Sequence, residues 1–355
     1  MAIQRFQGSS VQLDFGPLTE SSFPQKLAQF SAQKILILVD ENTQQHCLDY
    51  LLTSFEQLAH AEVIVLPPGE ETKSIDYALQ LWELLTDYEV SKKDLLICLG
   101  GGVVSDLGAF VASTYKRGLN CILLPTSLLA MIDAAIGGKN GIDFKGYKNL
   151  IGTIQQPDHI YMDPGFLHSL PWPEYLSGLG EGLKHSLISG PDLWQYYKND
   201  VSFAIENKQQ LSTALLWELI QVKINIVEQD PFEIGVRQVL NLGHTLGHAF
   251  EARCMESEPI AHGVAVAWGL AYEAQIAKAQ GLLDQDAAQE LFDFVRANYS
   301  ALPEIALDAM GLVPFLNQDK KNQDNRWRYA ALKSPGSYLL NQSFDLAQLE
   351  AVLKS

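Results

Sequence analysis

Basic residues are scarce in this chain. Its 25 lysines and arginines stand against 42 aspartates and glutamates, so the formal net charge is −17. Such an excess of acidic groups repels nucleic acid and anionic membranes, and neither is an expected partner. An anionic substrate would therefore need a local cluster of basic side chains that opposes the overall charge.

Signals for secretion and membrane insertion are also missing. The four cysteines form no C-x-x-C pair, and Cys98 and Cys121 lie inside apolar runs, as small core residues do. The N-terminal MAIQRFQGSSVQLDF lacks a basic start followed by an apolar stretch, and no apolar run reaches membrane-spanning length. We expect a soluble cytoplasmic protein. With 355 residues, 47% of them hydrophobic, it is expected to form two domains.

The first half of the chain alternates two kinds of pattern. Nearly continuous apolar runs at 34–40, 62–67, 94–100 and 120–125 suit strands buried on both faces of a parallel sheet. Between them, apolar residues recur at helical spacing, as in the stretch that follows Ser74, a residue that can cap a helix. This alternation predicts an open α/β domain.

The second half is predominantly helical. We place the boundary after Ser169, before the proline-rich LPWPEYLSG. Residues 337–342 are the only late strand candidate. Helical patterns are expected at 193–206, 208–228, 244–254, 262–280 and 284–298.

Three consecutive glycines begin at the last residue of the apolar run at 94–100. Gly100, Gly101 and Gly102 stand between a predicted strand and a predicted helix, where backbone N–H groups and a helix N-terminus can bind a phosphate. The alternative is a tight turn. Asp40 and Asn42 end another strand at the same predicted edge, where they can bond ribose hydroxyls or form a turn.

A glycine-rich stretch downstream carries polar and basic groups. Asp133, Lys139, Lys148 and Asn149 lie within MIDAAIGGKNGIDFKGYKNLIG, which we interpret as a loop region. Two lysines and an amide suit an anion such as phosphate. The alternative is a solvated loop, which is the usual setting of lysine.

Histidines gather in the helical half. His244 and His248 lie four residues apart on one predicted helix face, and the Glu of an H-E-x-x-H protease motif is absent. His262 follows, and Glu181 lies upstream with Lys184 one turn later. Catalytic zinc takes three protein ligands, so four candidates compete for three positions and the residues alone leave the choice open. Core histidines and a Glu–Lys helix pair are the alternatives.

Several ordered motifs, taken together, resemble one family. They are PPGEETKS, GGGVVSDLGAFVASTYKRG, LPTSLLAMIDAAIGGK, KNLIGTIQQP, SGLGEGLKH, RQVLNLGHTLGHAFE, HGVAVAWG and DKKN. The chain resembles the 3-dehydroquinate synthase family of sugar-phosphate cyclases from its first predicted strand to its C-terminus.

The resemblance implies a fold and a metal site. It implies a Rossmann-like NAD-binding α/β domain at 1–169 and an all-α metal- and substrate-binding domain at 170–355, with the active site in the cleft. It further implies that Glu181, His244 and His262 bind Zn²⁺ or Co²⁺. His248 would instead lie beside the substrate phosphate and take part in proton transfer.

The implied reaction converts 3-deoxy-D-arabino-heptulosonate 7-phosphate to 3-dehydroquinate and phosphate, within aromatic amino acid biosynthesis. NAD⁺ oxidises the C5 hydroxyl, phosphate leaves by elimination, NADH returns the hydride, and the ring opens and closes again by an aldol step. The phosphate dianion can itself take the C6 proton.

The same resemblance assigns roles to further residues. It implies a homodimer in which Arg117 reaches into the neighbouring subunit's site. Lys223 and Arg237 would hold the substrate carboxylate. The pocket would be lined by Asp133, Lys139, Asn149, Lys184, Asn241 and Lys320, of which Lys139, Asn149 and Lys320 lie near the phosphate with His248. NAD would contact Asp40, Asn42, Glu70, Lys73, Gly101, Gly102, Val103, Asp106, Thr126, Ser127, Lys139, Lys148, Phe166 and Ser169.

Three positions depart from the family's usual motifs. Asn140 replaces Thr in GGKT, Ser105 replaces a Gly in the glycine loop, and Gly180 replaces an Ala before Glu181. None of these changes removes a charged group or a metal ligand, so they affect fine geometry rather than the reaction.

Three other functions compete with this one. A cyclase for a substrate without a carboxylate, such as sedoheptulose 7-phosphate, would leave Lys223 and Arg237 unpaired. A zinc polyol dehydrogenase of the glycerol-dehydrogenase type would not need Lys139, Asn149 and Lys320. A catalytically inactive protein that senses NAD or metal would not need all these positions filled.

Overall fold

The computed structural model describes residues 2–145, 147–255, 257–317 and 326–354. The chain divides into two compact units, Met1–Pro171 and Trp172–Ser355. This division lies two residues beyond the boundary expected after residue 169.

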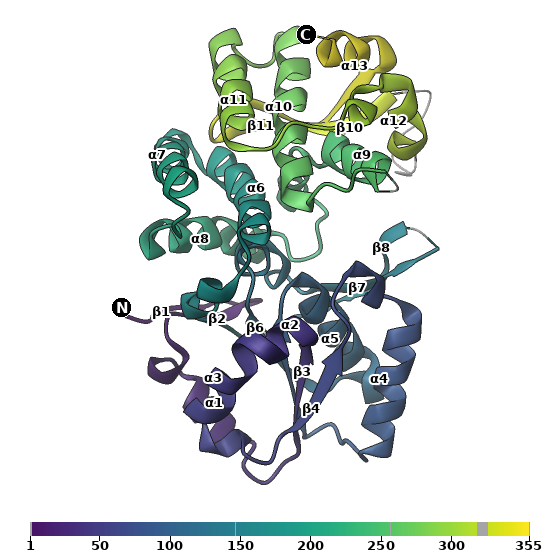
Figure 1. Ribbon diagram of the computed structural model, residues 1–355. Coiled ribbons are helices and arrows are strands. Elements are labelled where there is room, and N and C mark those ends of the chain that lie inside the picture. Colours follow the sequence, from purple (N-terminus) through teal and green to yellow (C-terminus); the bar gives the residue numbers. More distant parts are fainter. Residues whose placement is uncertain (1, 146, 256, 318–325, 355) are drawn as a thin grey trace. The chain divides into compact units, whose positions relative to one another are not determined.

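A seven-stranded sheet forms the centre of the first unit (Figure 1). Its strand order is β1-β2-β9-β6-β5-β3-β4, parallel except for the β1–β2 pair. The apolar runs at 34–40, 94–100 and 120–125 form its buried middle strands, as predicted from their continuous hydrophobicity. The strands are β1 (Gln4–Gln7), β2 (Gln12–Phe15), β3 (Ile35–Asp40), β4 (Glu62–Leu66), β5 (Leu95–Gly100), β6 (Asn120–Pro125) and β9 (His159–Met162).

The order of the strands reverses beside β3. Strand β4 pairs with one edge of β3 and β5 pairs with the other, so the chain crosses over between them. In open α/β sheets such a switch point leaves a crevice outside the carboxyl ends of the two strands, where ligands bind. Here those ends carry Asp40 on β3 and Gly100 on β5.

Helices lie on both sides of this sheet (Figure 1). Ser74 occupies the N-cap position of α4, but its side chain makes no capping hydrogen bond, which corrects that expectation. The helical elements are α1 (Phe23–Ala28), α2 (Glu41–Thr43), α3 (Asp49–Ser54), α4 (Ile75–Asp87) and α5 (Gly102–Thr114), with short turns η1 (Leu18–Glu20), η2 (Gln44–Leu48), η3 (Glu56–Leu58), η4 (Glu70–Thr72), η5 (Tyr115–Arg117), η6 (Ala130–Ala134) and η7 (Pro164–Ser169).

The glycine-rich stretch at 131–152 is not the loop region that we expected. It begins with the wide helical turn η6 and continues into an antiparallel hairpin of β7 (Lys139–Phe144) and β8 (Tyr147–Ile154). Its glycines allow the two strands to approach closely, because a Cβ on Gly152 would lie 2.2 Å from the carbonyl oxygen of Asn140.

The second unit is built around α10, which packs against α6, α9, α11 and α13. It is helical but not entirely so, because β10 and β11 form an antiparallel pair; only β11 had a predicted counterpart, at 337–342. The elements are α6 (Trp172–Ser189), α7 (Pro191–Asn207), α8 (Thr213–Gln229), η8 (Val236–Asn241), α9 (His244–Cys254), α10 (His262–Ala279), α11 (Gln285–Asn298), η9 (Glu304–Leu307), α12 (Ala309–Leu316), β10 (Arg326–Ser334), β11 (Ser337–Asp345) and α13 (Leu346–Leu353).

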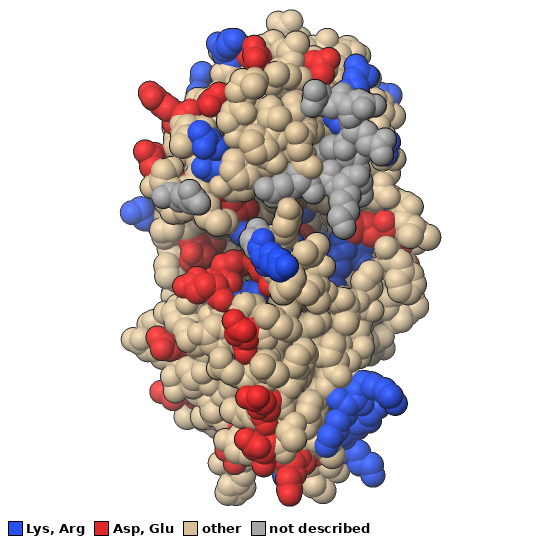
Figure 2. Space-filling model, turned by 90° about the vertical axis from the view of Figure 1, so that its right-hand side faces the viewer, with Lys and Arg blue, Asp and Glu red and all other residues tan. Residues whose placement is uncertain are grey.

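The surface reflects the acidic composition. In the lower half of Figure 2, acidic side chains follow one another down the molecule, whereas basic side chains gather at the lower right. Among the described helices, none combines the length and the apolar character needed to span a bilayer.

Candidate functional site

Glu181 is a buried carboxylate in the middle of α6, with 1% of its surface exposed. Lys184, one turn later and equally buried, forms an ion pair with its Oε2 atom. Burial raises the pKa of Glu181, but the charges of Lys184 and His244 and the histidine hydrogen bonds outweigh it and bring the pKa well below the usual value. An ionised carboxylate is therefore held inside the helical unit.

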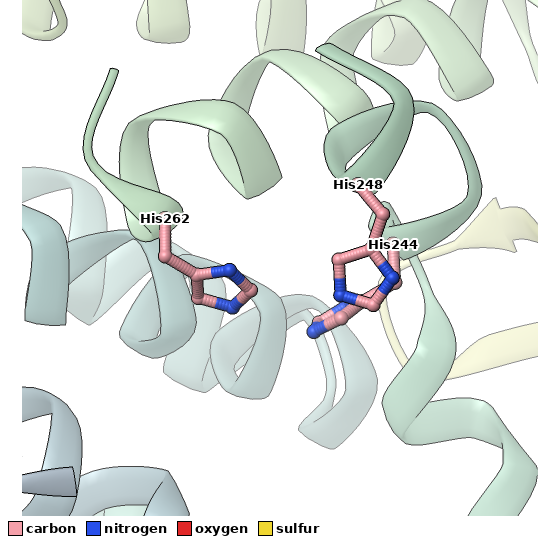
Figure 3. Close-up of side chains that lie close together, drawn as sticks. All are labelled: His244, His248 and His262. Carbon is pink, nitrogen blue, oxygen red and sulfur yellow. The ribbon is translucent and has the colours of Figure 1, made fainter. Parts of the chain in front are cut away.

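Two histidines meet this carboxylate from different helices. His244 is the first residue of α9 and His262 is the first residue of α10. The Nε2 atom of each lies 3.3 Å from the same oxygen, Oε1 of Glu181. Figure 3 shows the two imidazoles converging from separate helix ends. Three potential ligand atoms thus converge although they come from sequence positions as far as 81 residues apart.

The other ring nitrogen of each histidine has a partner of its own. Nδ1 of His244 lies 3.2 Å from the carbonyl oxygen of Leu242, and Nδ1 of His262 lies 3.0 Å from Oε2 of Glu251. A carbonyl oxygen can only accept, so Nδ1 of His244 donates to it, and Nε2 is the nitrogen that a metal would bind. Zinc-binding histidines are oriented in this way by a carbonyl or carboxylate behind them.

The two histidines differ in charge in the absence of a metal. Burial and the nearby Lys184 lower the pKa of His244, which favours the neutral ring that binds metal. Burial also lowers the pKa of His262, but hydrogen bonds to Glu181 and Glu251 raise it to about 10. A metal at this site would replace the proton of His262, as metal binding commonly does.

His248 lies next to this group but in a different environment. Its ring is exposed, 5.1 Å from the ring of His244 and 5.7 Å from that of His262. Its potential ligand atom lies within 4.8 Å of theirs, so three histidines also satisfy the distances of a metal site. The exclusion of His248 from the ligand set therefore stays a prediction.

Glycines determine how closely these helices approach. A Cβ on Gly180 would lie 2.0 Å from the carbonyl oxygen of Gly263, and a Cβ on Gly269 would lie 2.0 Å from that of Gly243. These glycines are adjacent in sequence to the three candidate ligands: Gly180 precedes Glu181, Gly243 precedes His244, and Gly263 follows His262. The departure at Gly180 thus falls at the crossing of α6 and α10, where it permits backbone contact beside Glu181.

The residues expected to hold a carboxylate are both buried. Lys223 lies on α8, and Arg237 lies on η8 with 1% of its surface exposed, so an exposed surface pair between Arg237 and Glu233 is excluded. Nη1 of Arg237 donates to the carbonyl oxygen of Pro231 at 2.6 Å. Asn241, at the end of η8, donates to Glu233 at 3.0 Å. Buried guanidinium and ammonium groups suit a bound anion.

In the first unit, the glycine loop forms the expected strand-to-helix turn. Gly100 ends β5 and Gly102 begins α5, whose N-cap is Gly101. A Cβ on Gly101 would approach the Ser127 hydroxyl at 3.4 Å, and the amide of Thr126 donates to Gly100. Two predicted cofactor segments therefore meet at the carboxyl ends of β5 and β6, with the N-terminus of α5 available for a phosphate.

Lys73 is the buried centre of a polar cluster beside α5. It bonds Asp106 at 2.6 Å and also donates to Oδ1 of Asn149 on β8. Burial lowers the pKa of Lys73, but the charges of Asp106 and Glu70 raise it above the ordinary value. Lys148 approaches Glu70 at 3.9 Å. Residues from three segments predicted to contact the cofactor or the phosphate are thus brought together.

The remaining predicted residues of the first unit have varied settings. Asp40 accepts from the amide of Thr43 in a capping box, so the turn is its observed role, while Asn42 is exposed. Phe166 packs edge-on against Tyr50. The others are Val103 in the first turn of α5, Asp133 in η6, Lys139 at the start of β7, Ser169 at the end of η7 and the exposed Arg117 in η5. Lys320 lies outside the described residues.

Two acidic residues of this region were not predicted. Glu251 lies seven residues after His244 and orients His262. Glu273 lies on α10 and accepts hydrogen bonds from the start of α9. Helical spacing puts Glu251 on the same face as His244 and could have indicated it, whereas no sequence pattern connects Glu273 to a segment 27 to 30 residues away.

Comparisons with known proteins agree on one family. Residues 63–177 match the model for the N-terminal part of 3-dehydroquinate synthase, and residues 178–322 match the model for its C-terminal part. A 3-dehydroquinate synthase of Parabacteroides distasonis is 34% identical over 319 residues, or 89% of both chains. Another from Streptococcus pyogenes serotype M6 is 39% identical over 295 residues, or 82% of this chain and 81% of that one.

Solved structures share the fold at lower identity. A 2-deoxy-scyllo-inosose synthase complexed with carbaglucose-6-phosphate, NAD⁺ and Co²⁺ is 20% identical with a TM-score of 0.86, over 99% of both chains. A 2-epi-5-epi-valiolone synthase from Streptomyces hygroscopicus, with NAD⁺ and Zn²⁺ bound, is 22% identical with a TM-score of 0.84, over 100% of this chain and 98% of that one. A probable glycerol dehydrogenase from Sinorhizobium meliloti has a TM-score of 0.60.

Proposed function

The chain belongs to the 3-dehydroquinate synthase family, and we propose that it converts 3-deoxy-D-arabino-heptulosonate 7-phosphate to 3-dehydroquinate and phosphate. One observation carries the assignment: the two family models match consecutive segments over residues 63–322. The reaction is a phosphate elimination coupled to a transient oxidation and completed by ring opening and aldol closure.

We propose that Glu181, His244 and His262 hold one Zn²⁺ or Co²⁺ ion. The donor set fits, because a buried ionised carboxylate faces two imidazole Nε2 atoms whose Nδ1 atoms are held from behind. A bound divalent ion supplies a Lewis acid that lowers the pKa of a coordinated hydroxyl. The carboxylate fixes the distance between the two histidines, and Lys184 keeps that carboxylate ionised.

We further propose that NAD binds at the carboxyl edge of the sheet in the first unit. The amides at the start of α5 can hold the pyrophosphate, and Asp40, Asn42 and the cluster around Lys73 can contact the rest of the cofactor. Bound NAD⁺ supplies a reversible hydride acceptor. Lys73 connects α5 to the hairpin, because it pairs with Asp106 on α5 and also donates to Asn149 on β8.

Charged side chains of the second unit are proposed to select the substrate. Arg237 offers a planar pair of donors to a carboxylate, and Lys223 offers a second positive charge. We assign His248 to proton transfer at the phosphate, because its exposed imidazole lies beside the proposed ligands His244 and His262. Lys139, Asn149 and Lys320 are proposed to bind the phosphate, and Asp133, Lys184 and Asn241 to contact the sugar.

A homodimer is proposed on the evidence of an exposed apolar strand. Tyr147, Leu150, Ile151 and Ile154 on β8 are 37 to 50% exposed. Such a strand with apolar side chains is a surface that another chain tends to cover. The turn that carries Arg117 lies beside its end, because a Cβ on Gly118 would be 3.8 Å from the side chain of Gln155. An interface on β8 would therefore bring Arg117 to a second copy.

The cytoplasm is the proposed location. All four cysteines are free and buried, which suits a reducing compartment.

A coupled assay of phosphate release tests the function. The protein is incubated with the heptulosonate phosphate, one divalent metal and a trace of NAD⁺, and we expect stoichiometric phosphate without accumulation of NADH. Sedoheptulose 7-phosphate serves as the matched substrate without a carboxylate and should react far more slowly. Stoichiometric NADH, or equal rates with both substrates, would contradict the proposal.

A further inference from the structure

Helix α9 begins without a cap of its own. Its N-cap position is Gly243, at φ +77°, which has no side chain to accept from the amides of the first turn. Those amides are unsatisfied within any helix and normally need a side-chain oxygen. Here the oxygen comes from another helix: Glu273 of α10 accepts from the amide of Gly243 at 2.8 Å and from that of Leu246 at 3.0 Å.

The burial of the Glu273 carboxyl group is energetically unfavourable and requires compensating contacts. Only 2% of its surface is exposed, and burying a carboxylate is unfavourable unless hydrogen bonds compensate it. Both of its oxygens point at α9, one toward Gly243 and the other toward Leu246, where the helix N-terminus adds partial positive charge. It lies eleven residues after His262, about 16 Å further along the axis of α10, so it is not itself a candidate ligand.

The two amides that Glu273 binds flank His244. This histidine is the first residue of α9, and its Nδ1 is bonded to the carbonyl oxygen of Leu242, next to Gly243. The same turn is pressed against α10, because a Cβ on Gly269 would lie 2.0 Å from the carbonyl oxygen of Gly243. The backbone on both sides of His244 is thus tied to α10, which also carries His262.

We propose that Glu273 is a positioning residue for the metal site: it locks the first turn of α9 onto α10, so that His244 and His262 face Glu181 at a fixed separation. This inference rests on the proposed metal site. Glu273 would orient His244 by binding the backbone of its helical turn rather than its imidazole ring.

Both oxygens of Glu273 accept hydrogen bonds from α9, although burial outweighs these bonds and raises the pKa of the side chain to about 8. Gln at this position would turn an NH₂ group toward an amide N–H, and Ala would leave both amides without acceptors. Asp keeps two acceptors but withdraws them by one methylene. Gln275 on the same helix provides a matched control, since it is also buried and donates to the carbonyl oxygen of Ala288 on α11, away from α9.

The test compares metal affinity among folded variants. Apo-protein of the wild type and of Glu273→Gln, Glu273→Asp and Gln275→Ala is titrated with Zn²⁺ against a chromophoric chelator, after circular dichroism has confirmed helical content. We expect the two Glu273 variants to bind 10- to 100-fold more weakly, as when residues that orient metal ligands are changed, and Gln275→Ala to bind as the wild type does. The visible spectrum of bound Co²⁺ should also change in Glu273→Asp. This variant keeps the carboxyl group, so it still tests the inference if Glu273→Gln does not fold.

Two results separate failure of this inference from failure of the metal site. If the wild type binds Zn²⁺ and His244→Ala does not, while Glu273→Asp binds with unchanged affinity and an unchanged Co²⁺ spectrum, Glu273 is only a helix cap and the inference is overturned. If the wild type itself binds no metal, or His244→Ala binds normally, the proposed ligand set fails and the positioning role fails with it.

Discussion

Gly263→Ala probes directly how the candidate metal site is assembled. A Cβ on Gly263 would lie 1.6 Å from the carbonyl oxygen of Ser177 on α6 and 2.5 Å from its carbonyl carbon. Ordinary contact begins near 3.4 Å, so the two helices would have to separate by roughly 1.8 Å, because close-packed backbone has no other room to yield. This separation would also stretch the hydrogen bond from the amide of Gly263 to the Ser177 hydroxyl, now 3.0 Å long.

The substitution should affect metal binding more than stability. Overpacking destabilises by about 1–3 kcal/mol, and the better helix propensity of Ala offsets up to about 1 kcal/mol of this. We therefore expect the free energy of unfolding to fall by ~1–2 kcal/mol. Metal–ligand distances tolerate only about 0.2 Å, so a shift of this size takes His262 out of reach of a metal held by Glu181 on α6. We expect Zn²⁺ affinity to fall at least ~100-fold, equivalent to about 2.7 kcal/mol.

Gly182→Ala is the matched control. Gly182 also lies on α6, but its Cβ would point at the ring of Tyr197 at 3.0 Å, on the side that faces α7. Both variants should lose some thermal stability in a melting experiment, while only Gly263→Ala should lose Zn²⁺ in a chelator competition. A Gly263→Ala protein with normal Zn²⁺ affinity would refute the argument that this helix crossing sets the ligand geometry.

Three further predictions address other residues. Arg237→Ala should lower kcat/KM for the heptulosonate phosphate at least about thirtyfold, the low end of the ~2–5 kcal/mol cost of losing a buried charge pair, with unchanged NAD⁺ affinity; near-normal kcat/KM would favour the substrate without a carboxylate. Metal analysis should find metal in purified His248→Ala but little in His244→Ala, and equal loss in both would contradict the ligand set. Burial raises the pKa of Asp14, but hydrogen bonds from His159 and Ser22 lower it to about 2. The ionised side chain therefore stabilises the fold at pH values above its ordinary pKa of 3.8. This contribution disappears as the pH falls toward 2. Urea unfolding should therefore show that Asp14→Asn lowers the free energy of unfolding by roughly 1–2 kcal/mol at pH 7, after allowance for solvent screening. The difference from the wild type should shrink between about pH 4 and pH 2. A difference that stays constant over this range would refute the stabilising role of ionised Asp14.

The elements with strong local patterns could be predicted from the sequence. The run at 94–100 is apolar throughout and became β5, buried along its whole length, and the pattern at 244–254 became α9 with the same bounds. The hairpin of β7 and β8 could not be predicted in this way. Its strands contain glycine and carry mostly exposed side chains on β8, so the alternation that marks a half-buried strand is absent.

The composition of the candidate site depended on packing. The i, i+4 spacing makes His244 and His248 equivalent on one helix face, but the crossing of α6, α9 and α10 brings Nε2 of His244 to the carboxylate of Glu181 and leaves the ring of His248 exposed. The anchors Glu251 and Glu273 likewise became visible only once α9 and α10 lay together. Helix and strand periodicity is a property of neighbouring residues and can be read locally. The choice among chemically equivalent side chains depends on contacts between segments distant in the chain, which form only when the helices pack.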